Sequence, residues 1–196
     1  QMERRHFNAY YCSTNEEALT KALSIIEKGS VIASGGSATL GEVGLLDYIK
    51  NHSEDYTFID RSIAKTEDEK RQIHAKAILS DYYLMSTNAF TIDGQLVNID
   101  GNGNRVSALC YGPKHVVIIT GMNKLVPSVD AAYKRIRQDA CPPNCVRLGL
   151  TNPCSKTGIC GECMSASSIC DLFVTTRMSR YPDRIHVIMV GEELGY

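Results

Sequence analysis

Long apolar runs are missing from this sequence. No stretch approaches the roughly 18 consecutive apolar residues that a membrane-spanning helix needs, and the opening residues QMERRHFNAYYC lack the apolar core of a secretory signal peptide. Internal repeats and low-complexity segments are missing as well. These absences argue against a membrane-spanning helix and a repeat array, and we expect a cytoplasmic protein.

An excess of charge of either sign is also missing. The chain has 21 Lys and Arg against 22 Asp and Glu, and its basic residues are scattered rather than interleaved with aromatic ones. Composition therefore gives no electrostatic basis for binding nucleic acid or an anionic membrane. With 196 residues, of which 43% are hydrophobic, the chain has globular composition, and we expect a single domain over residues 1–196.

Short apolar segments alternate with amphipathic ones along the first two thirds of the chain. Strands are predicted at 9–12, 30–34, 56–60, 81–87 and 115–120, and helices at 13–29, 41–50, 66–80 and 127–140. The segment AFTIDGQLVNID, with Asp93-Gly94 at its turn, predicts a hairpin. Two further strands are predicted near the C-terminus. This order predicts the α/β class, with an open, mostly parallel sheet and flanking helices.

A Gly-Gly-Ser turn follows the predicted strand at 30–34. Gly35 and Gly36 would let a phosphate or carboxylate approach the backbone, and Ser37 and Thr39 would add hydroxyl donors. Glu42, in the helix that follows, is a candidate acid–base residue. The segment lacks the Walker and full GxGxxG patterns, so a tight turn that binds nothing is the alternative.

A second polar segment follows the predicted strand at 81–87. Its first polar residues fall at the carboxyl end of a parallel strand, where open α/β sheets hold ligands. In the Gly-rich turn beyond it, Arg105 could bind an anion with two hydrogen bonds and Asp100 could act as a base. Ordinary turn chemistry is the alternative. The candidate ligand-binding residues here are Ser86, Thr87, Asn88, Asn102, Gly103, Asn104 and Arg105.

Six of the eight cysteines lie within residues 141–170. Four of them, Cys154, Cys160, Cys163 and Cys170, have the spacing C-x5-C-x2-C-x6-C. The segment has few large apolar residues to form a core, which favours a loop held by a metal. Four thiolates fit a 4Fe-4S cluster first, a zinc ion second and disulfides third. Cys141 and Cys145 are interpreted as partly buried thiols outside the set.

Four segments together resemble the LUD-domain family, of the lactate-utilisation protein C type. They are SGGSATLGEVGLLD, STNAFTIDGQLVNIDGNGNRVSALCYGP, NPCSKTGICGECMSASSIC and RIHVIMVGEELGY, and the resemblance runs from about residue 9 to the end. It implies a fold similar to the ribose-5-phosphate isomerase and CoA-transferase group. The four-cysteine loop resembles that of a subgroup, in which it looks like an iron–sulfur motif.

The resemblance also implies a role beside iron–sulfur oxidoreductase subunits that oxidise lactate to pyruvate. On this hypothesis the two polar turns bind a small anionic metabolite or a nucleotide-bearing cofactor, and the cysteine loop relays electrons. The alternatives are a non-redox isomerase or acyl-transferase, in which Asp100 or Glu42 does acid–base work beside a structural metal, and a small-anion-binding or assembly protein. The apolar terminal strands could support a homodimer.

Overall fold

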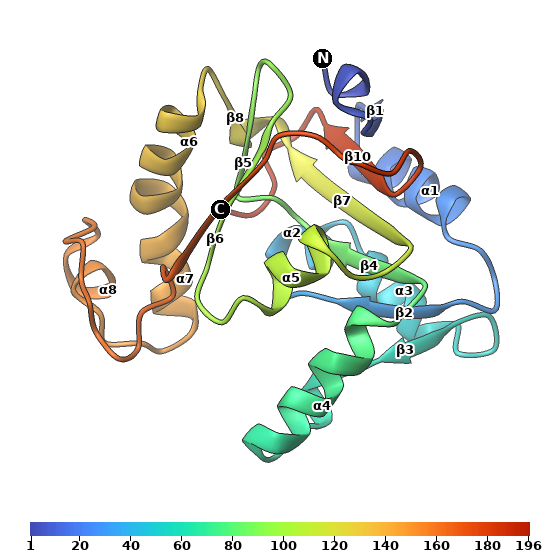
Figure 1. The fold of residues 1–196 in the computed structure, drawn as a ribbon, viewed down its shortest axis with the longest axis horizontal. Helices are drawn as coiled ribbons and strands as arrows, with labels where there is room; N and C mark the ends of the chain where they lie inside the picture. Colours follow the sequence, from blue (N-terminus) through green and yellow to red (C-terminus); the bar gives the residue numbers. More distant parts are fainter.

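A six-stranded sheet with all strands parallel forms the centre of the structure, a computed structural model that describes residues 1–196 (Figure 1). Its strand order is β1 (Asn8–Cys12), β10 (Ile185–Val190), β7 (His115–Gly121), β4 (Tyr82–Met85), β2 (Val31–Ser34) and β3 (Thr57–Ile59). The predicted α/β class with a parallel sheet is confirmed.

Both faces of this sheet are covered, as a parallel sheet requires. Since side chains alternate along a strand, Val117 and Ile119 of β7 face one cluster and Val116 and Ile118 face the other. The first cluster includes α1 (Asn15–Ile25), α2 (Ala38–Glu42) and α3 (Leu45–Asn51). The second includes α4 (Glu67–Ile78), α5 (Asn104–Cys110) and part of a second sheet.

The second sheet is a feature that the sequence did not predict. Its order is β8 (Leu125–Val126), β5 (Ala89–Thr91), β6 (Leu96–Asp100) and β9 (Leu172–Thr176). The antiparallel β5–β6 pair is the predicted hairpin. The two predicted C-terminal strands separate, because β9 pairs with β6 in this sheet whereas β10 pairs with β7 in the parallel sheet.

Three short helices lie on the side of the second sheet that faces away from the parallel sheet (Figure 1). They are α6 (Val129–Arg135), α7 (Cys141–Arg147) and α8 (Pro153–Thr157), and a π-helical turn, Ile136–Ala140, joins the first two. The predicted cysteine loop at 141–170 therefore begins as a helix. None of the helices in the structure has the length and apolarity that crossing a bilayer requires.

Side-chain caps explain where several helices begin. Thr66 and Glu69 form a reciprocal capping box at the start of α4, and the Thr14 hydroxyl accepts from the Glu17 N–H at the start of α1. The helix predicted at 41–50 is broken in two, because Gly44 adopts a left-handed conformation with φ of 77° between α2 and α3. Three 3-10 turns complete the chain: Glu3–Arg5, Arg61–Ile63 and Met122–Lys124.

The segment after β10 crosses the carboxyl end of β7. Leu194 donates its N–H to Asn123 Oδ1 over 3.2 Å, and Gly195 donates its N–H to Glu42 Oε2 over 2.7 Å. A Cβ atom on Gly121 would lie 2.6 Å from Leu194 N and 2.7 Å from Glu192 O. The last residue of β7 must therefore be glycine for this segment to pack against the sheet edge.

We predict that Gly121→Ala lowers the free energy of unfolding by about 1–3 kcal/mol, the usual cost of an overpacked contact. Gly41→Ala is the matched control, because a Cβ there meets nothing within 4 Å and the site is inside helix α2. It should be neutral or stabilising by up to about 1 kcal/mol. Urea denaturation checks both, and equal midpoints for the two variants would contradict the packing argument.

Candidate functional site

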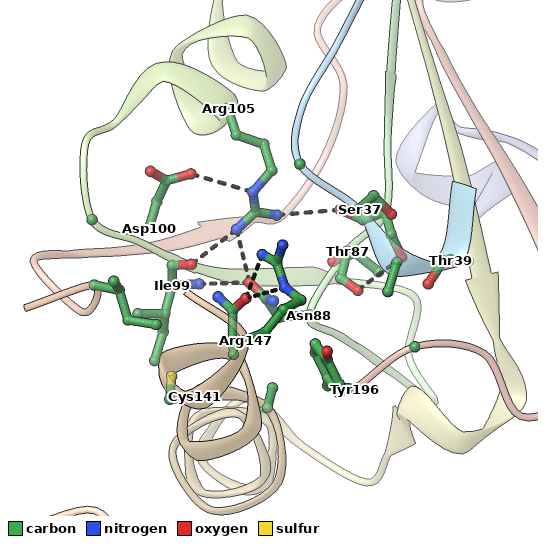
Figure 2. A pocket seen from close by; sticks show the side chains of 18 of the residues that line it. Ser37, Thr39, Thr87, Asn88, Ile99, Asp100, Arg105, Cys141, Arg147 and Tyr196 are labelled. Carbon is green, nitrogen blue, oxygen red and sulfur yellow. Dashed lines mark hydrogen bonds and ion pairs between the residues drawn. The ribbon is translucent and has the colours of Figure 1, made fainter. Parts of the chain in front are cut away.

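One pocket brings together most of the polar residues that the sequence analysis selected. It lies beyond the carboxyl ends of β2 and β4 and has a volume of about 270 Å³ (Figure 2). The selected residues in its wall are Gly36, Ser37, Thr39, Ser86, Thr87, Asn88, Asp100, Asn102, Asn104 and Arg105. Segments far apart in the chain meet here because neighbouring parallel strands end at the same edge.

Arg105 is the most heavily hydrogen-bonded side chain of the pocket. Its Nε pairs with Asp100 Oδ2 at 3.2 Å, and its Nη1 donates to Ser86 O and Asn98 Oδ1. Its Nη2 donates to Asn88 Oδ1 at 2.8 Å and to Ile99 O at 2.9 Å. A guanidinium has five N–H groups, so all five are used within the protein. Figure 2 shows the bonds to Asp100, Asn88 and Ile99. This occupancy disfavours the expected role of Arg105 as a bidentate anion ligand and favours a positioning role.

Asp100 is also engaged by the protein itself. Its Oδ1 accepts the N–H groups of Asn102 and Gly103, and its Oδ2 pairs with Arg105. These bonds hold the Gly-rich turn in which Gly103, with φ of 80°, precedes helix α5. Asp100 therefore fixes the turn and has no oxygen left without a partner, which disfavours the expected role as a base.

Three other selected residues do not line the pocket. Glu42 is exposed and accepts the Gly195 N–H, so it holds the C-terminal segment. Gly35 packs against Arg105, since a Cβ there would lie 3.3 Å from Arg105 Cδ. Gly103 shapes the turn through its backbone. Within the wall, Ser37 caps α2 by accepting the Leu40 N–H, and that helix has only five residues.

Lys124 is a pocket residue that the sequence analysis missed. It is 3% exposed, and its Nζ donates to Thr39 Oγ1 over 3.0 Å and to Ser86 Oγ over 3.2 Å. Its partners are two hydroxyls, and none of the ion pairs in the structure includes it. Burial, reinforced by the charge of Arg135, lowers the pKa of Lys124 to about 8. Lys124 is therefore a buried cation without a carboxylate.

Arg61 and Arg147 are two further cations of the wall that the sequence analysis missed. Arg61 lies over the Gly-Gly-Ser turn, because a Cβ on Gly36 would be 2.6 Å from its Nη2. Arg147 donates to Asn144 Oδ1 in its own helix, and both arginines are exposed. Lys124 and Arg61 each follow a strand of the parallel sheet, so the strand-end rule that selected Ser86 could have found them.

The pocket is strongly cationic. Its wall has four basic side chains, Arg61, Arg105, Lys124 and Arg147, and one acidic side chain, Asp100. Four positive charges less one negative charge leave a side-chain charge of +3. The charges of Arg105 and Asp100 compensate each other. The other three cations have no carboxylate partner among the ion pairs of the structure. The arrangement is suited to a small anion.

Two pairs of the clustered cysteines lie close together, and each pair includes one cysteine that the sequence analysis set apart. Cys145 Sγ lies 3.6 Å from Cys154 Sγ, and Cys141 Sγ lies 3.4 Å from Cys170 Sγ. The bond to Cys170, then burial and the charges of Cys145 and Cys160, raise the pKa of Cys141. Burial, the bond to Cys145 and the charges of Cys163 and Cys170 raise the pKa of Cys154 to about 11.

The donor chemistry fits a thiophilic centre, although the thiols do not converge on one point. All eight cysteines are free, and no three Cys, His, Asp or Glu side chains are close enough to hold one ion. Soft thiolates select zinc and iron–sulfur clusters. N–H donors also reach sulfur, since Asn152 Nδ2 donates to Cys145 Sγ and Arg137 Nε donates to Cys160 Sγ. Such outer bonds orient metal thiolates.

Comparison with known proteins gives a family and a fold. A family model described as LUD domain matches residues 1–190. The structure is similar to that of a DUF162 family protein from Deinococcus radiodurans, with a TM-score of 0.52 and 15% identity over 97% of this chain and 94% of that chain. At this identity the likeness shows the fold. None of the curated proteins matches the chain.

Two more distant likenesses cover part of other solved chains. Ribose 5-phosphate isomerase from Plasmodium falciparum gives a TM-score of 0.36 and 18% identity, over 56% of this chain and 51% of that chain. The delta subunit of eIF2B from Chaetomium thermophilum gives 0.40 and 14%, over 87% and 54%.

We predict that Arg105→Ala lowers the free energy of unfolding by about 2–4 kcal/mol, because it leaves buried acceptors and Asp100 without their cation. Arg147→Ala, the control from the same pocket, removes an exposed side chain and should change stability by less than about 0.5 kcal/mol. Chemical denaturation with both variants measures this. A small effect of Arg105→Ala would show that the network is dispensable.

Proposed function

Since the chain belongs to the LUD-domain family, we propose that it is a component of an oxidoreductase system for lactate or a similar small organic acid. The pocket binds the acid through its carboxylate, and the neighbouring cysteines hold an iron–sulfur cluster that transfers electrons. The observation that carries this proposal is that Cys141 lines the anion pocket and also lies 3.4 Å from Cys170 of the cysteine loop.

The size and charge of the pocket support a small carboxylate. A volume of about 270 Å³ suits a metabolite of a few carbon atoms, and three of its cations have no internal carboxylate partner. Lys124 is the strongest candidate for direct binding, because it is buried between two hydroxyls and a bound anion would remove the cost of its unpaired charge. Arg61 and Arg147 would close around the outer part of the acid.

The loop thiols support a cluster as the electron carrier. Cys154, Cys160, Cys163 and Cys170 would hold it, and a 4Fe-4S cluster supplies one-electron transfer when bound. Arg137 is placed to stabilise negative charge there, because its Nε donates to Cys160 Sγ at 3.4 Å and its Nη2 pairs with Glu162 at 2.6 Å. Oxidation of a 2-hydroxy acid releases two electrons, so partner iron–sulfur subunits would complete the system.

A non-redox enzyme is the second candidate, and Lys124 is the observation that favours it. A buried amine with a pKa of about 8 can exchange a proton near neutral pH, as acid–base catalysis requires. On this alternative the thiols would hold a structural zinc ion. Asp100 supports this alternative less, because hydrogen bonds and an ion pair already occupy its carboxylate. Glu42 also supports it less, because it lies outside the pocket wall.

We predict that protein purified without oxygen is brown and contains about four iron and four sulfide per chain. Its broad visible absorption should bleach under dithionite. Cys160→Ala combined with Cys163→Ala should abolish the colour, whereas Cys110→Ala, at the end of α5, should retain it. Colourless wild-type protein with one zinc ion per chain would refute the electron-transfer role and favour the second candidate.

We predict that Lys124→Met weakens lactate binding at least about tenfold, the loss expected for one charge-assisted bond, and also stabilises the unliganded protein. The free energy of unfolding should rise by up to about 3 kcal/mol at pH 7, since the folded pKa of about 8 lies below the ordinary 10.5. At low pH, folding must bury the charged ammonium of Lys124, and this lowers the stability of the wild-type protein. The destabilisation disappears as the pH rises from about 8 to 10.5.

Calorimetric titration with lactate and thermal unfolding across pH 6–10 measure the two effects. Wild-type affinity should fall about tenfold per pH unit above pH 8, as the ammonium loses its proton. Lys114→Met is the control, because Lys114 is exposed and pairs with Asp81 at the opposite end of β7. A Lys124→Met protein that is destabilised and still binds lactate would show that Lys124 is structural.

A further inference from the structure

Two cysteines outside the four-cysteine spacing are among the most buried sulfurs of the group. Cys141 is 6% exposed, Cys145 is 1% exposed and Cys154 is 7% exposed, whereas Cys160, Cys163 and Cys170 are half-buried. A pair of buried thiols can simply be small apolar residues, and Cys141 does contact the apolar cluster under α6. However, both thiols also contact cysteines of the loop, which a purely apolar packing role does not explain.

Helix α7 presents both thiols to the loop. Cys141 and Cys145 are four residues apart, so they lie on one face of the helix. That face meets the two ends of the cysteine spacing, with 3.6 Å between the sulfurs of Cys145 and Cys154 and 3.4 Å between those of Cys141 and Cys170. Tetrahedral zinc thiolates, with Zn–S near 2.3 Å, place their sulfurs about 3.8 Å apart, so these separations are close to the edges of such a site.

The phase of this face depends on the break before α7. Pro142 and Pro143 have no N–H to donate to the carbonyls of Gln138 and Asp139, and the chain takes a π-helical turn over Ile136–Ala140. Such turns are frequent at functional sites. The turn also contains Arg137, whose Nε donates to Cys160 Sγ. The helical segment from the π-helical turn through α7 therefore contacts the cysteine loop both through its buried thiols and at the half-buried Cys160.

Asn152 connects the loop to Cys145. This side chain is 2% exposed, and its Nδ2 donates to Cys145 Sγ at 3.5 Å and to Ser167 O at 2.9 Å. Its Oδ1 accepts from the hydroxyls of Ser165 and Ser167. A buried amide whose N–H is directed at a sulfur is the outer contact that stabilises a bound thiolate. Here that contact goes to a helix cysteine rather than to one of the four loop cysteines.

We propose that Cys141 and Cys145 are ligands of the metal centre, which is a thiophilic site bound between helix α7 and the cysteine loop rather than within the loop alone. This inference rests on the proposed function insofar as that function places a metal centre at these thiols. It assigns a ligand role to two residues that the C-x5-C-x2-C-x6-C spacing leaves out. Because such a site takes four thiolates, Cys141 and Cys145 would replace two of the four loop cysteines as ligands. It also makes the pocket wall and the metal site share a ligand, because Cys141 belongs to both.

The experiment is an anaerobic titration of the reduced full chain with cobalt(II), followed by competition with a chelator. Sulfur-to-cobalt charge-transfer absorption reports the number of bound thiolates, and the competition reports affinity. The test variant is Cys141→Ala combined with Cys145→Ala. The control is Cys12→Ala combined with Cys110→Ala, because these two thiols lie in β1 and at the end of α5. Thermal unfolding of each metal-free variant monitors folding.

We expect the Cys141/Cys145 variant to bind cobalt at least about tenfold more weakly, with a weaker charge-transfer band, and the control to match the wild type. An unchanged affinity and band in that variant, with binding lost in Cys154→Ala/Cys170→Ala, would overturn the inference and leave the loop site of the proposed function intact. Wild-type protein that binds neither cobalt nor iron would refute the metal centre of the proposed function as well.

Where the double variant fails to fold, the single variants Cys141→Ala and Cys145→Ala are compared with the wild type in the same titration, and two unchanged single variants overturn the proposal. Mass spectrometry of wild-type protein kept without oxygen detects Cys141–Cys170 and Cys145–Cys154 disulfides. Their presence would make these pairs covalent links and would also overturn it.

Discussion

The hydrogen bonds of one largely buried guanidinium hold the functional end of this structure together. Arg105 comes from the start of α5, and its five N–H groups reach the loop after β4 and the residues of β6. Arg105 therefore connects the end of strand β4 in the parallel sheet to strand β6 in the second sheet. Burying a charge is costly unless the charge is paired and hydrogen-bonded, and Arg105 satisfies both conditions. The pocket depends on this network, because all of these residues except Asn98 form part of its wall.

Lys124 differs from Arg105 in the one respect that matters for binding. Both are basic side chains of the same wall. Lys124 is buried and Arg105 is largely buried, but Arg105 has Asp100 at 3.2 Å and Lys124 has two neutral hydroxyls. The first charge is satisfied within the chain and positions its neighbours. The second remains costly until an anion arrives, and that cost is the physical reason for proposing that it binds one. The sign of the stability change on removing each cation separates these two roles.

The sulfur-rich end has little apolar material of its own and depends on polar contacts for its shape. Asn152 uses both its amide nitrogen and its oxygen to gather Cys145, Ser165 and Ser167, and Arg137 reaches Cys160 from the π-helical turn. Cys141 stands where the sulfur group meets the pocket. A small-acid site and an electron carrier at these two places would share a wall, which is the spatial basis of the proposed function.

Local patterns in the sequence predicted most of the strands and helices and the hairpin at Asp93-Gly94, because each depends on residues near in the chain. They also located the two polar turns, since strand ends can be read from the sequence. Only the tertiary structure decided that β6 pairs with β9, that Lys124 lies between Thr39 and Ser86, and that Arg105 is fully occupied. It alone brought Cys141 and Cys145 to the loop thiols. These facts depend on strand order and on the phase of a helix after a π-helical turn, which are set by contacts between distant segments.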